Sequence, residues 1–397
     1  MRKFNCRVCG NKVKPYLNLG NQPLANNLLE KNEVGHEKFY PLEVAACPSC
    51  GLNQLTEVVN ASEMFTTYSY VTSKNVGMVN HLKDFAEHIN DQMNLRDKKV
   101  VDIGGNDGTL CKHFKNLGAQ PINVDPSDNL SKISVQEGIK TFKEYFSEET
   151  ARKIGKASVI TATNVFAHVD NLQSFINGVS LMLNNDSIFV FEVPHFMNLV
   201  LKGEFDTIYH EHLSYFLTHP LSLLFKKFNL SLFKIEELAV HGGSIRCYVG
   251  KKPEDGSVTK LHLKEISSGM YSFKTLLDLR LEIEINRRNL IKFLSTERKR
   301  GKRIVGYGAP AKATVLTNYY NLDNDIIEYA VDVSPFKIGK YIPGSHIPVV
   351  DEKVFHEDNP DYAILFPWNW KNELLSKEKD FKGKWIIPVP KLQVINH

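Results

Sequence analysis

The chain lacks the features that mark membrane, secreted and nucleic-acid-binding proteins. No apolar run approaches the roughly 20 residues that span a bilayer, and the first residues, from Met1 to Cys6, lack the apolar stretch of a secretory signal. The 49 basic residues nearly balance the 45 acidic ones, and a net charge of +4 is too small for the basic surface that nucleic-acid binding usually needs. We therefore expect a cytoplasmic protein without a membrane or nucleic-acid partner.

Cysteine is also scarce, and its placement is informative. Six cysteines in 397 residues are too few for a disulfide framework. Four of them form two Cys-x-x-Cys pairs near the N-terminus, Cys6 with Cys9 and Cys47 with Cys50. Two such pairs supply the four thiolates that Zn²⁺ prefers in a tetrahedral site, and nothing in them suggests an open coordination position. The sequence thus predicts a structural zinc ion in a zinc-ribbon-like module.

After the cysteine-rich region the sequence predicts an α/β domain. Apolar residues at helical spacing predict a helix from about residue 76 to 96, which leads into a buried strand at 98–103 and a glycine-rich turn. Further strands are expected at 121–126, 157–162 and 188–193, with a helix at 172–183. This alternation is typical of a doubly wound parallel sheet. Two antiparallel strands, at 229–238 and 244–249, would close the sheet.

The last third of the chain predicts a second, smaller α/β domain. An amphipathic pattern over residues 271 to about 300 predicts a long helix that bridges the two domains. A second strand-turn-helix unit then begins at Arg303, and strands are expected near 327–331, 362–366 and 385–388. The length of 397 residues allows two or three domains. We divide the chain into a zinc-binding domain (1–70), a central domain (71–270) and a C-terminal α/β domain (271–397).

The turn after the first strand of the central domain is the most informative motif. It reads Asp102-Ile103-Gly104-Gly105-Asn106-Asp107-Gly108, which does not match the G-x-G-x-x-G of dinucleotide sites. It resembles the first loop of class I S-adenosylmethionine (SAM) methyltransferases, acid-x-G-x-G-x-G, with Asn106 replacing the middle glycine. Asp125, at the end of the second strand, is placed to accept hydrogen bonds from two ribose hydroxyls. The residues expected to bind SAM are Asp102, Gly104, Asn106, Gly108, Asp125 and Asn164.

A second group of reactive side chains follows the strand at 188–193. The stretch Tyr209-His210-Glu211-His212-Leu213-Ser214-Tyr215 cannot be a zinc protease motif, because its two histidines stand two residues apart and cannot share a helical face. We interpret it as an acid-base cluster in which Tyr209, Glu211 and Tyr215 point away from His210 and His212, and a carboxylate fixes the tautomer of one imidazole. His168 adds an imidazole that can donate to an oxyanion.

In their order along essentially the whole chain, these motifs resemble the zinc-containing sugar C-methyltransferases. The resemblance rests on both cysteine pairs, Tyr-Ser-Tyr-Val-Thr-Ser (68–73), Val-Asp-Ile-Gly-Gly-Asn-Asp-Gly, Asn-Val-Phe-Ala-His-Val, Tyr-His-Glu-His-Leu-Ser-Tyr, His-Gly-Gly-Ser-Ile-Arg (241–246) and Gly-Tyr-Gly-Ala-Pro-Ala-Lys. It implies three domains with the substrate cleft between them. It also implies transfer of the SAM methyl group, through an enolate, to C-3' of a nucleotide-linked 4-keto-6-deoxy sugar in the biosynthesis of a branched deoxysugar.

The same resemblance implies roles for individual residues. His212 is the leading candidate for the base, with Tyr209 and Glu211 positioning or assisting it, and Tyr209 is the competing base. His168 is the candidate donor to the developing oxyanion. The sugar nucleotide is expected to contact Tyr68, Tyr70, His241 and Lys312. The turn at 306–311 before Lys312 could hold the diphosphate, be purely structural or bind NAD.

Two other functions remain open from the residues alone. A zinc-ribbon methyltransferase acting on RNA or protein would share the SAM loop, but the near-neutral charge and the absence of a Pro-Pro-aromatic motif count against it. A non-catalytic zinc-ribbon binding module with degenerate α/β domains would not need Asp125 or the Tyr-His-Glu-His cluster. A monomer or a small homo-oligomer is expected.

Overall fold

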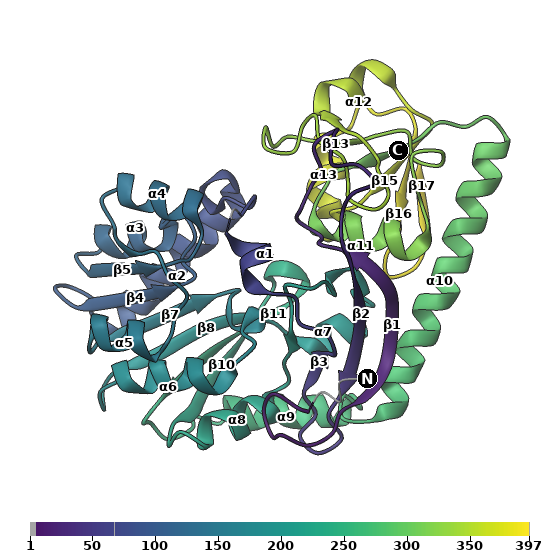
Figure 1. The fold of residues 1–397 in the computed structure, drawn as a ribbon. Helices are drawn as coiled ribbons and strands as arrows, with labels where there is room; N and C mark the ends of the chain where they lie inside the picture. The colour runs from purple at the N-terminus through teal and green to yellow at the C-terminus, as the bar shows by residue number, and fades with distance from the viewer. Residues whose placement is uncertain (1–4, 67, 397) are drawn as a thin grey trace.

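Three sheets organise the protein (Figure 1). The computed structural model describes residues 5–66 and 68–396. A four-stranded sheet lies in the N-terminal region, a seven-stranded sheet in the central region and a six-stranded sheet in the C-terminal region. Among the described residues, no helix is long and apolar enough to cross a membrane. The predicted α/β class, with a zinc-ribbon-like module, a doubly wound sheet and a smaller C-terminal α/β unit, is confirmed.

The N-terminal sheet is antiparallel and takes its last strand from the central region. Its strands, in order, are β1 (Lys14–Pro23), β2 (Phe39–Ala46), β3 (Asn53–Leu55) and β9 (Ser214–Tyr215). In the last pair, Asn53 lies opposite Tyr215 and Gln54 opposite Ser214. A short helix, α1 (Ala61–Phe65), follows β3. Because β9 comes directly after residues 209–212, the N-terminal sheet holds that segment from one side.

The central sheet has the order β10-β11-β8-β7-β4-β5-β6. Strands β4 to β8 are parallel, whereas β11 is antiparallel to both of its neighbours. The order reverses between β4 and β7, and in open parallel sheets ligands bind at this point, beyond the carboxyl ends of the strands. The strands are β4 (Lys99–Ile103), β5 (Gln120–Val124), β6 (Lys140–Phe142), β7 (Val159–Thr163), β8 (Ile188–Pro194), β10 (Ser231–Leu238) and β11 (Ser244–Gly250).

Helices flank this sheet and connect its strands. The first one begins after the Asn75 side chain, which accepts a hydrogen bond from the Met78 amide, and ends at Asn94 in the left-handed conformation. The α-helices are α2 (Val76–Met93), α3 (Thr109–Asn116), α4 (Asp128–Gln136), α5 (Glu148–Ile154), α6 (Leu172–Met182), α7 (Phe196–Leu201), α8 (Thr218–Lys226) and α9 (Ser257–Ser267). Short 3-10 helices are η1 (Thr72–Lys74), η2 (Phe166–His168), η3 (Phe205–Thr207) and η4 (Val240–Gly242).

The C-terminal unit is reached through one long helix, α10 (Phe273–Lys299), which runs along the side of the molecule beside β1 (Figure 1). Its sheet has the order β14-β13-β12-β15-β16-β17, with the last strand antiparallel to its neighbour. The strands are β12 (Ile304–Tyr307), β13 (Ala330–Asp332), β14 (Val349–Asp351), β15 (Tyr362–Leu365), β16 (Lys384–Ile387) and β17 (Gln393–Asn396). The helices are α11 (Ala311–Tyr320), α12 (Glu352–Asp358), η5 (Trp368–Trp370) and α13 (Lys371–Lys377).

The four cysteines predicted to bind zinc converge beside the N-terminal sheet. Cys6 Sγ lies 3.5 Å from Cys50 Sγ, and Cys9 Sγ lies 3.4 Å from Cys47 Sγ. All four sulfur atoms lie within 4.8 Å of one another. Four sulfurs bound about 2.3 Å from a tetrahedral zinc ion lie about 3.8 Å apart. The donor set therefore fits one Zn²⁺ held by four thiolates.

Both cysteine pairs fold into the same kind of turn. The Gly10 amide donates to the Cys6 carbonyl and the Gly51 amide to the Cys47 carbonyl, each at 2.9 Å. The two glycines have φ values of +80° and +78°, which glycine adopts without steric cost. A Cβ atom on Gly51 would also lie 2.5 Å from the ring of Tyr271. A glycine after the second cysteine of each pair is thus required by the turn that aims both thiolates at the metal.

The zinc assignment predicts a loss of metal and of stability in Cys9→Ser. Because the energy of metal binding is also folding energy in a small metal-binding module, this variant should melt at a lower temperature and retain less than about a tenth of the zinc. Metal analysis of the purified protein and a thermal melt measure both effects. Cys111→Ser, a buried thiol outside the cluster, is the matched control and should keep its zinc. A full zinc complement in Cys9→Ser would contradict the assignment.

Candidate active site

All three regions of the chain contribute to one cavity of about 1260 Å³. A pocket for one small ligand usually measures about 300–1,000 Å³, so this cavity has room for two ligands. The N-terminal side supplies residues around 58–76, the central sheet supplies the ends of β4, β5 and β7, and the C-terminal unit supplies the start of α11 and parts of η5 and α13. The expected site residues that line it are Tyr68, Tyr70, Asp102, Gly104, Asn106, Asp125, Asn164, His168, Tyr209, His212 and Lys312.

Two expected site residues that the structure fully describes, Gly108 and Glu211, are not among those that line the cavity. Gly108 has a φ of +81°, and a Cβ atom there would lie 2.5 Å from Ser134 Oγ. Its lack of a side chain therefore leaves room for α4, and the contact of Gly108 with SAM stays a prediction. The Glu211 carboxylate accepts hydrogen bonds from Asn26 and Tyr68, which themselves line the cavity. The side chain of His241 lies outside the described part of the structure.

The glycine-rich turn after β4 has the backbone that a SAM loop needs. Gly104 has a φ of +66°, and a Cβ atom there would lie 2.4 Å from Val165 Cγ2. Asn106, which replaces the middle glycine, has a φ of +56°. Asn is one of the few residues that adopt this left-handed conformation readily. The replacement therefore preserves the path of the loop.

Two buried carboxylates flank this turn. Asp125 Oδ2 accepts a hydrogen bond from the Asn106 amide and Oδ1 accepts one from the Ser127 amide, both at 2.9 Å. Burial raises the pKa of Asp125, and the two amides partly oppose that shift. Asp102 Oδ1 accepts from the Thr161 hydroxyl at 2.7 Å, and burial raises the pKa of Asp102 to about 7. An acidic acceptor at the end of β5 and a left-handed loop at the end of β4 fit the ribose and methionine parts of SAM.

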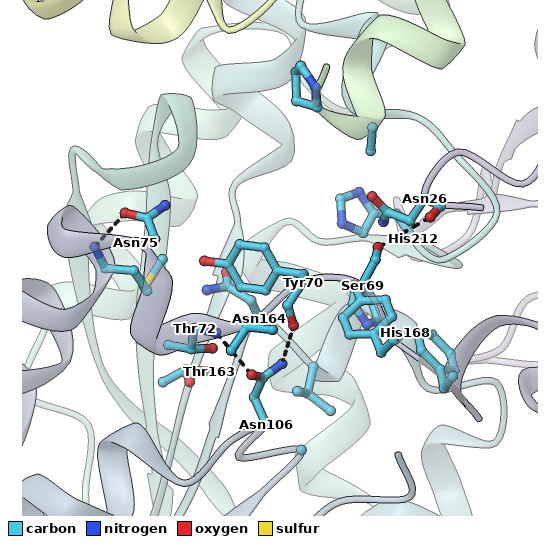
Figure 2. Close-up of a pocket in the computed structure, with 18 of the residues that line it drawn as sticks. Asn26, Ser69, Tyr70, Thr72, Asn75, Asn106, Thr163, Asn164, His168 and His212 are labelled. Carbon is cyan, nitrogen blue, oxygen red and sulfur yellow. Dashed lines mark hydrogen bonds between the residues drawn. The ribbon is translucent and has the colours of Figure 1, made fainter. Parts of the chain in front are cut away.

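His168 and His212 lie against each other because one backbone hydrogen bond joins their neighbours. The Leu213 amide donates to the Ala167 carbonyl at 2.9 Å, and the two imidazole rings stack with centroids 5.2 Å apart. Phe166, two residues before His168, is fully buried and packs against other phenylalanines of the core, namely Phe175, Phe189, Phe191, Phe216 and Phe225. Figure 2 labels both histidines at the wall of the cavity.

Residues 209–212 form a turn, which corrects the predicted alternation of their side chains. The His212 amide donates to the Tyr209 carbonyl at 2.9 Å, and such a turn places its first and fourth residues on the same side. The rings of Tyr209 and His212 accordingly lie 4.1 Å apart, and both line the cavity. His210 is buried against Tyr40 instead, with ring centroids 5.8 Å apart.

A backbone carbonyl, and not the predicted carboxylate, fixes the His212 tautomer. His212 Nδ1 donates to the Thr207 carbonyl at 2.7 Å, so in the neutral ring Nε2 is the basic nitrogen. The Glu211 carboxylate instead accepts hydrogen bonds from Asn26 Nδ2 at 2.6 Å and from the Tyr68 hydroxyl at 2.7 Å. Glu211 therefore holds the tyrosine that was predicted to contact the substrate.

The protonation states of this wall follow from its burial. Burial and the neighbouring His212 lower the pKa of His168 to about 3, so its imidazole is neutral at physiological pH. Burial, with the nearby charges of Glu211 and Asp206, raises the pKa of Tyr209 well above its usual value. Tyr209 therefore keeps its proton. The wall thus presents two hydrogen-bond donors beside His212.

The C-terminal wall presents a cation at the start of α11. The Lys312 ammonium lies 4.6 Å from the centroid of the Trp368 ring and 3.4 Å from Asn369 Oδ1. Trp368 in turn donates from its indole nitrogen to Asp206 Oδ2 at 2.6 Å. The side chain predicted to bind a diphosphate therefore shares the cavity with the SAM loop.

Several residues that support the site were missed by the sequence analysis. Arg7, between the first two cysteines, is buried, and its Nη1 donates to the carbonyls of Leu55 and Leu213. Its position inside a metal-binding turn was a usable signal. Asn26 lies in a loop and Trp368 begins η5, and the composition of neither segment gives such a signal. Their roles depend on partners far away in the chain.

Comparison with known proteins agrees with this geometry. Three family models match the chain: a zinc binding domain over residues 6–65, a methyltransferase domain over 78–235 and a C-methyltransferase C-terminal domain over 239–390. The chain is 32% identical over 405 residues to the C-methyltransferase NovU of Streptomyces niveus, and the match covers 98% of this chain and 96% of NovU.

Two solved structures of methyltransferases each resemble less than half of the chain. The magnesium protoporphyrin IX methyltransferase of Synechocystis PCC 6803 with bound SAH is 13% identical to this chain at a TM-score of 0.37. The match covers 45% of this chain and 84% of the chain of that methyltransferase. The ribosomal protein L11 methylase of Lactobacillus delbrueckii subsp. bulgaricus is 15% identical, covering 45% and 80% at a TM-score of 0.32.

The matches to the domain models identify two cofactors. The methyltransferase domain binds SAM, and the zinc binding domain contains the four clustered thiolates. Both agree with the loop and the cysteine geometry described above. Together with the identity to NovU along nearly its whole length, they show that this chain belongs to the SAM-dependent C-methyltransferases that carry an N-terminal zinc-binding domain.

Proposed function

We propose that the enzyme methylates C-3' of a nucleotide-linked 4-keto-6-deoxy sugar in the biosynthesis of a branched deoxysugar. The observation that carries this proposal is the His168-His212 pair with Tyr209, in the wall of a cavity that also contains the SAM loop and Lys312. A carbon next to a ketone becomes a nucleophile only after it loses its proton. When bound, SAM supplies the electrophilic methyl group. The polypeptide must supply a base and a stabiliser for the enolate.

His212 is the proposed base. The Thr207 carbonyl holds the proton of the neutral ring on Nδ1, so Nε2 can accept the C-3' proton. Tyr209 is the weaker candidate, because its raised pKa keeps the phenol protonated and a phenol cannot accept a proton. The ring centroids of Tyr209 and His212 lie 4.1 Å apart, so a protonated Tyr209 can instead orient the substrate or the His212 imidazole.

His168 is the proposed donor to the enolate oxygen at O-4'. A neutral imidazole carries one N–H, and its low pKa keeps it in that form. A donor placed where charge develops stabilises the transition state more than the ground state. Glu211 assists indirectly, because its carboxylate holds Tyr68.

The C-terminal wall is the proposed site of the diphosphate. Lys312 lies in the first turn of α11, and the preceding residues Pro310 and Ala311 also line the cavity. A helix N-terminus with an adjacent ammonium favours an anion. Tyr68 and Tyr70, between this wall and the SAM loop, are the proposed sugar contacts, together with His241.

We also propose that residues 1–70, 71–270 and 271–397 act as zinc-binding, SAM-binding and C-terminal domains. The matched regions support three units, although the C-methyltransferase C-terminal model begins at residue 239 and so includes β11 and α9. None of the six cysteines is joined in a disulfide, which supports a reducing, cytoplasmic environment. A monomer or small homo-oligomer without a nucleic-acid partner is part of the same proposal.

Asp125→Ala should weaken SAM binding. A charged acceptor is worth about 1.5–3 kcal/mol per hydrogen bond, so the loss of its bonds to ribose should reduce affinity by more than about tenfold. Calorimetry with S-adenosylhomocysteine measures this. Asp128→Ala removes an exposed carboxylate paired with Lys143 at the start of α4 and should bind normally. If Asp125→Ala binds as tightly as the wild type, another acid holds the ribose.

His212→Asn should lose exchange of the C-3' proton. The true base contributes roughly 10² to 10⁴ in rate, and its removal leaves SAM binding intact. Exchange of that proton with deuterated water, followed by NMR with S-adenosylhomocysteine present, isolates this step because no methyl can be transferred.

Tyr209→Phe and His36→Asn complete the comparison. Tyr209→Phe should exchange the C-3' proton at a rate closer to that of the wild type. His36→Asn makes the same change as His212→Asn at an exposed histidine and is its matched control. Wild-type exchange in His212→Asn together with none in Tyr209→Phe would transfer the role of base to Tyr209.

A further inference from the structure

Residues 68–75, which we name the strap, connect the N-terminal region to α2 and line the same cavity as the SAM loop. The strap carries Tyr68 and Tyr70 and includes the single turn of η1. Its hydrogen bonds reach both halves of the active site. The strap is therefore placed to connect the site of SAM with the site of the second substrate.

Asn106 holds the middle of the strap (Figure 2). Its Oδ1 accepts a hydrogen bond from the Thr72 amide at 3.0 Å, and its Nδ2 donates to the Tyr70 carbonyl at 3.1 Å. A glycine would give the loop the same left-handed backbone but could make neither bond. The side chain that departs from the generic SAM loop is thus the one that binds the strap.

Two other side chains, those of Asn129 and Asp107, bond to the two ends of the strap. Asn129, in α4, accepts from the Tyr68 amide at 3.2 Å and donates to the Tyr68 carbonyl at 2.8 Å. Asp107 accepts from the Ser73 amide at 2.9 Å. These side chains bond to backbone groups of a segment that forms no sheet ladder of its own. The order of the strap therefore depends on the elements that surround SAM.

The opposite side of the strap contacts residues in and around the turn at 209–212. The Tyr68 hydroxyl donates to Glu211 at 2.7 Å, and Ser69 Oγ donates to the Asn26 carbonyl at 3.2 Å. Glu211 stands between Tyr209 and His212 and also accepts from Asn26. A displaced strap would remove one of the two partners of the Glu211 carboxylate.

We propose that Asn106 is a positioning residue that couples the SAM loop to the second-substrate wall through the strap. The Asn106 backbone shapes the SAM loop, while its side chain holds the backbone of Tyr70 and Thr72 in place. Ordering of the SAM loop by its ligand then orders the strap, and by linkage an ordered strap favours the bound loop. The part of this inference that concerns the sugar rests on the proposed function, whereas the coupling between loop and strap does not.

The test is Asn106→Gly, which restores the generic glycine. We expect S-adenosylhomocysteine still to bind, because glycine adopts the same backbone, but roughly three- to tenfold more weakly, because the loss of the strap bonds removes the coupling. Hydrogen exchange of the Thr72 and Ser73 amides, measured with the ligand bound, should become at least about tenfold faster. Methyl transfer should fall by about tenfold or more, with KM for the sugar nucleotide raised.

Two further variants separate coupling from loop flexibility. Asn129→Ala removes strap bonds without altering the SAM loop and should also speed exchange of the strap. Asn229→Gly makes the same substitution at another left-handed asparagine, exposed and remote from the cavity, and should change none of these quantities.

Each alternative outcome has a definite meaning. Unchanged strap exchange in Asn106→Gly, or loss of S-adenosylhomocysteine binding, would overturn the proposal. Faster strap exchange with unchanged methyl transfer would overturn the positioning role. If the wild type itself methylates none of the 4-keto sugar nucleotides, the proposed substrate is wrong, but the exchange result still decides the coupling.

Discussion

The backbone of Leu213 is the junction on which the arrangement of the site depends. Its amide donates to the Ala167 carbonyl of the central region, while its carbonyl accepts from the Leu55 amide and from Arg7 Nη1 of the N-terminal region. Leu213 is thus bonded to both regions. His212 comes directly before Leu213, and His168 comes directly after Ala167. The meeting of the two imidazoles is therefore a consequence of main-chain pairing.

This junction explains how a structural metal can matter to chemistry at a distance. Arg7 lies inside the first cysteine pair, and β3 follows the second pair directly. The thiolates that bind zinc thereby fix both of the elements that hold Leu213 and β9. Loss of the metal would release the turn at 209–212 from one side, although no thiolate lines the cavity among the described residues.

The sequence allowed the local parts of this structure to be predicted. Strands β4, β7 and β8 are buried runs rich in apolar residues, and the two cysteine pairs and the acid at Asp125 carry recognisable spacing. The N-terminal sheet was not predicted, since β9, its last strand, comes some 160 residues after β3.

The side-chain partners were harder still to predict from local pattern. Glu211 bonds to residues 185 and 143 positions away, and no periodicity connects them. The alternation expected at 209–212 is wrong because the His212 amide bonds to the Tyr209 carbonyl and closes a turn, which the distant partners of the Leu213 backbone hold in place.

The stacking of the two histidines is consistent with the different roles that we propose for them. Two imidazolium ions with ring centroids 5.2 Å apart would repel strongly in a buried wall, so only one of them can be charged at a time. The buried His168 stays neutral and keeps an N–H to donate, whereas a proton that reaches His212 Nε2 turns that ring into a cation.

In the proposed reaction this cation forms beside the enolate that the same proton transfer creates. Glu211 and Asp206 also lie near this wall, and they accept hydrogen bonds from neutral donors, Glu211 from Asn26 and Tyr68 and Asp206 from Trp368. In the proposed reaction the new anion is therefore stabilised by the new cation and by the neutral donors of the wall.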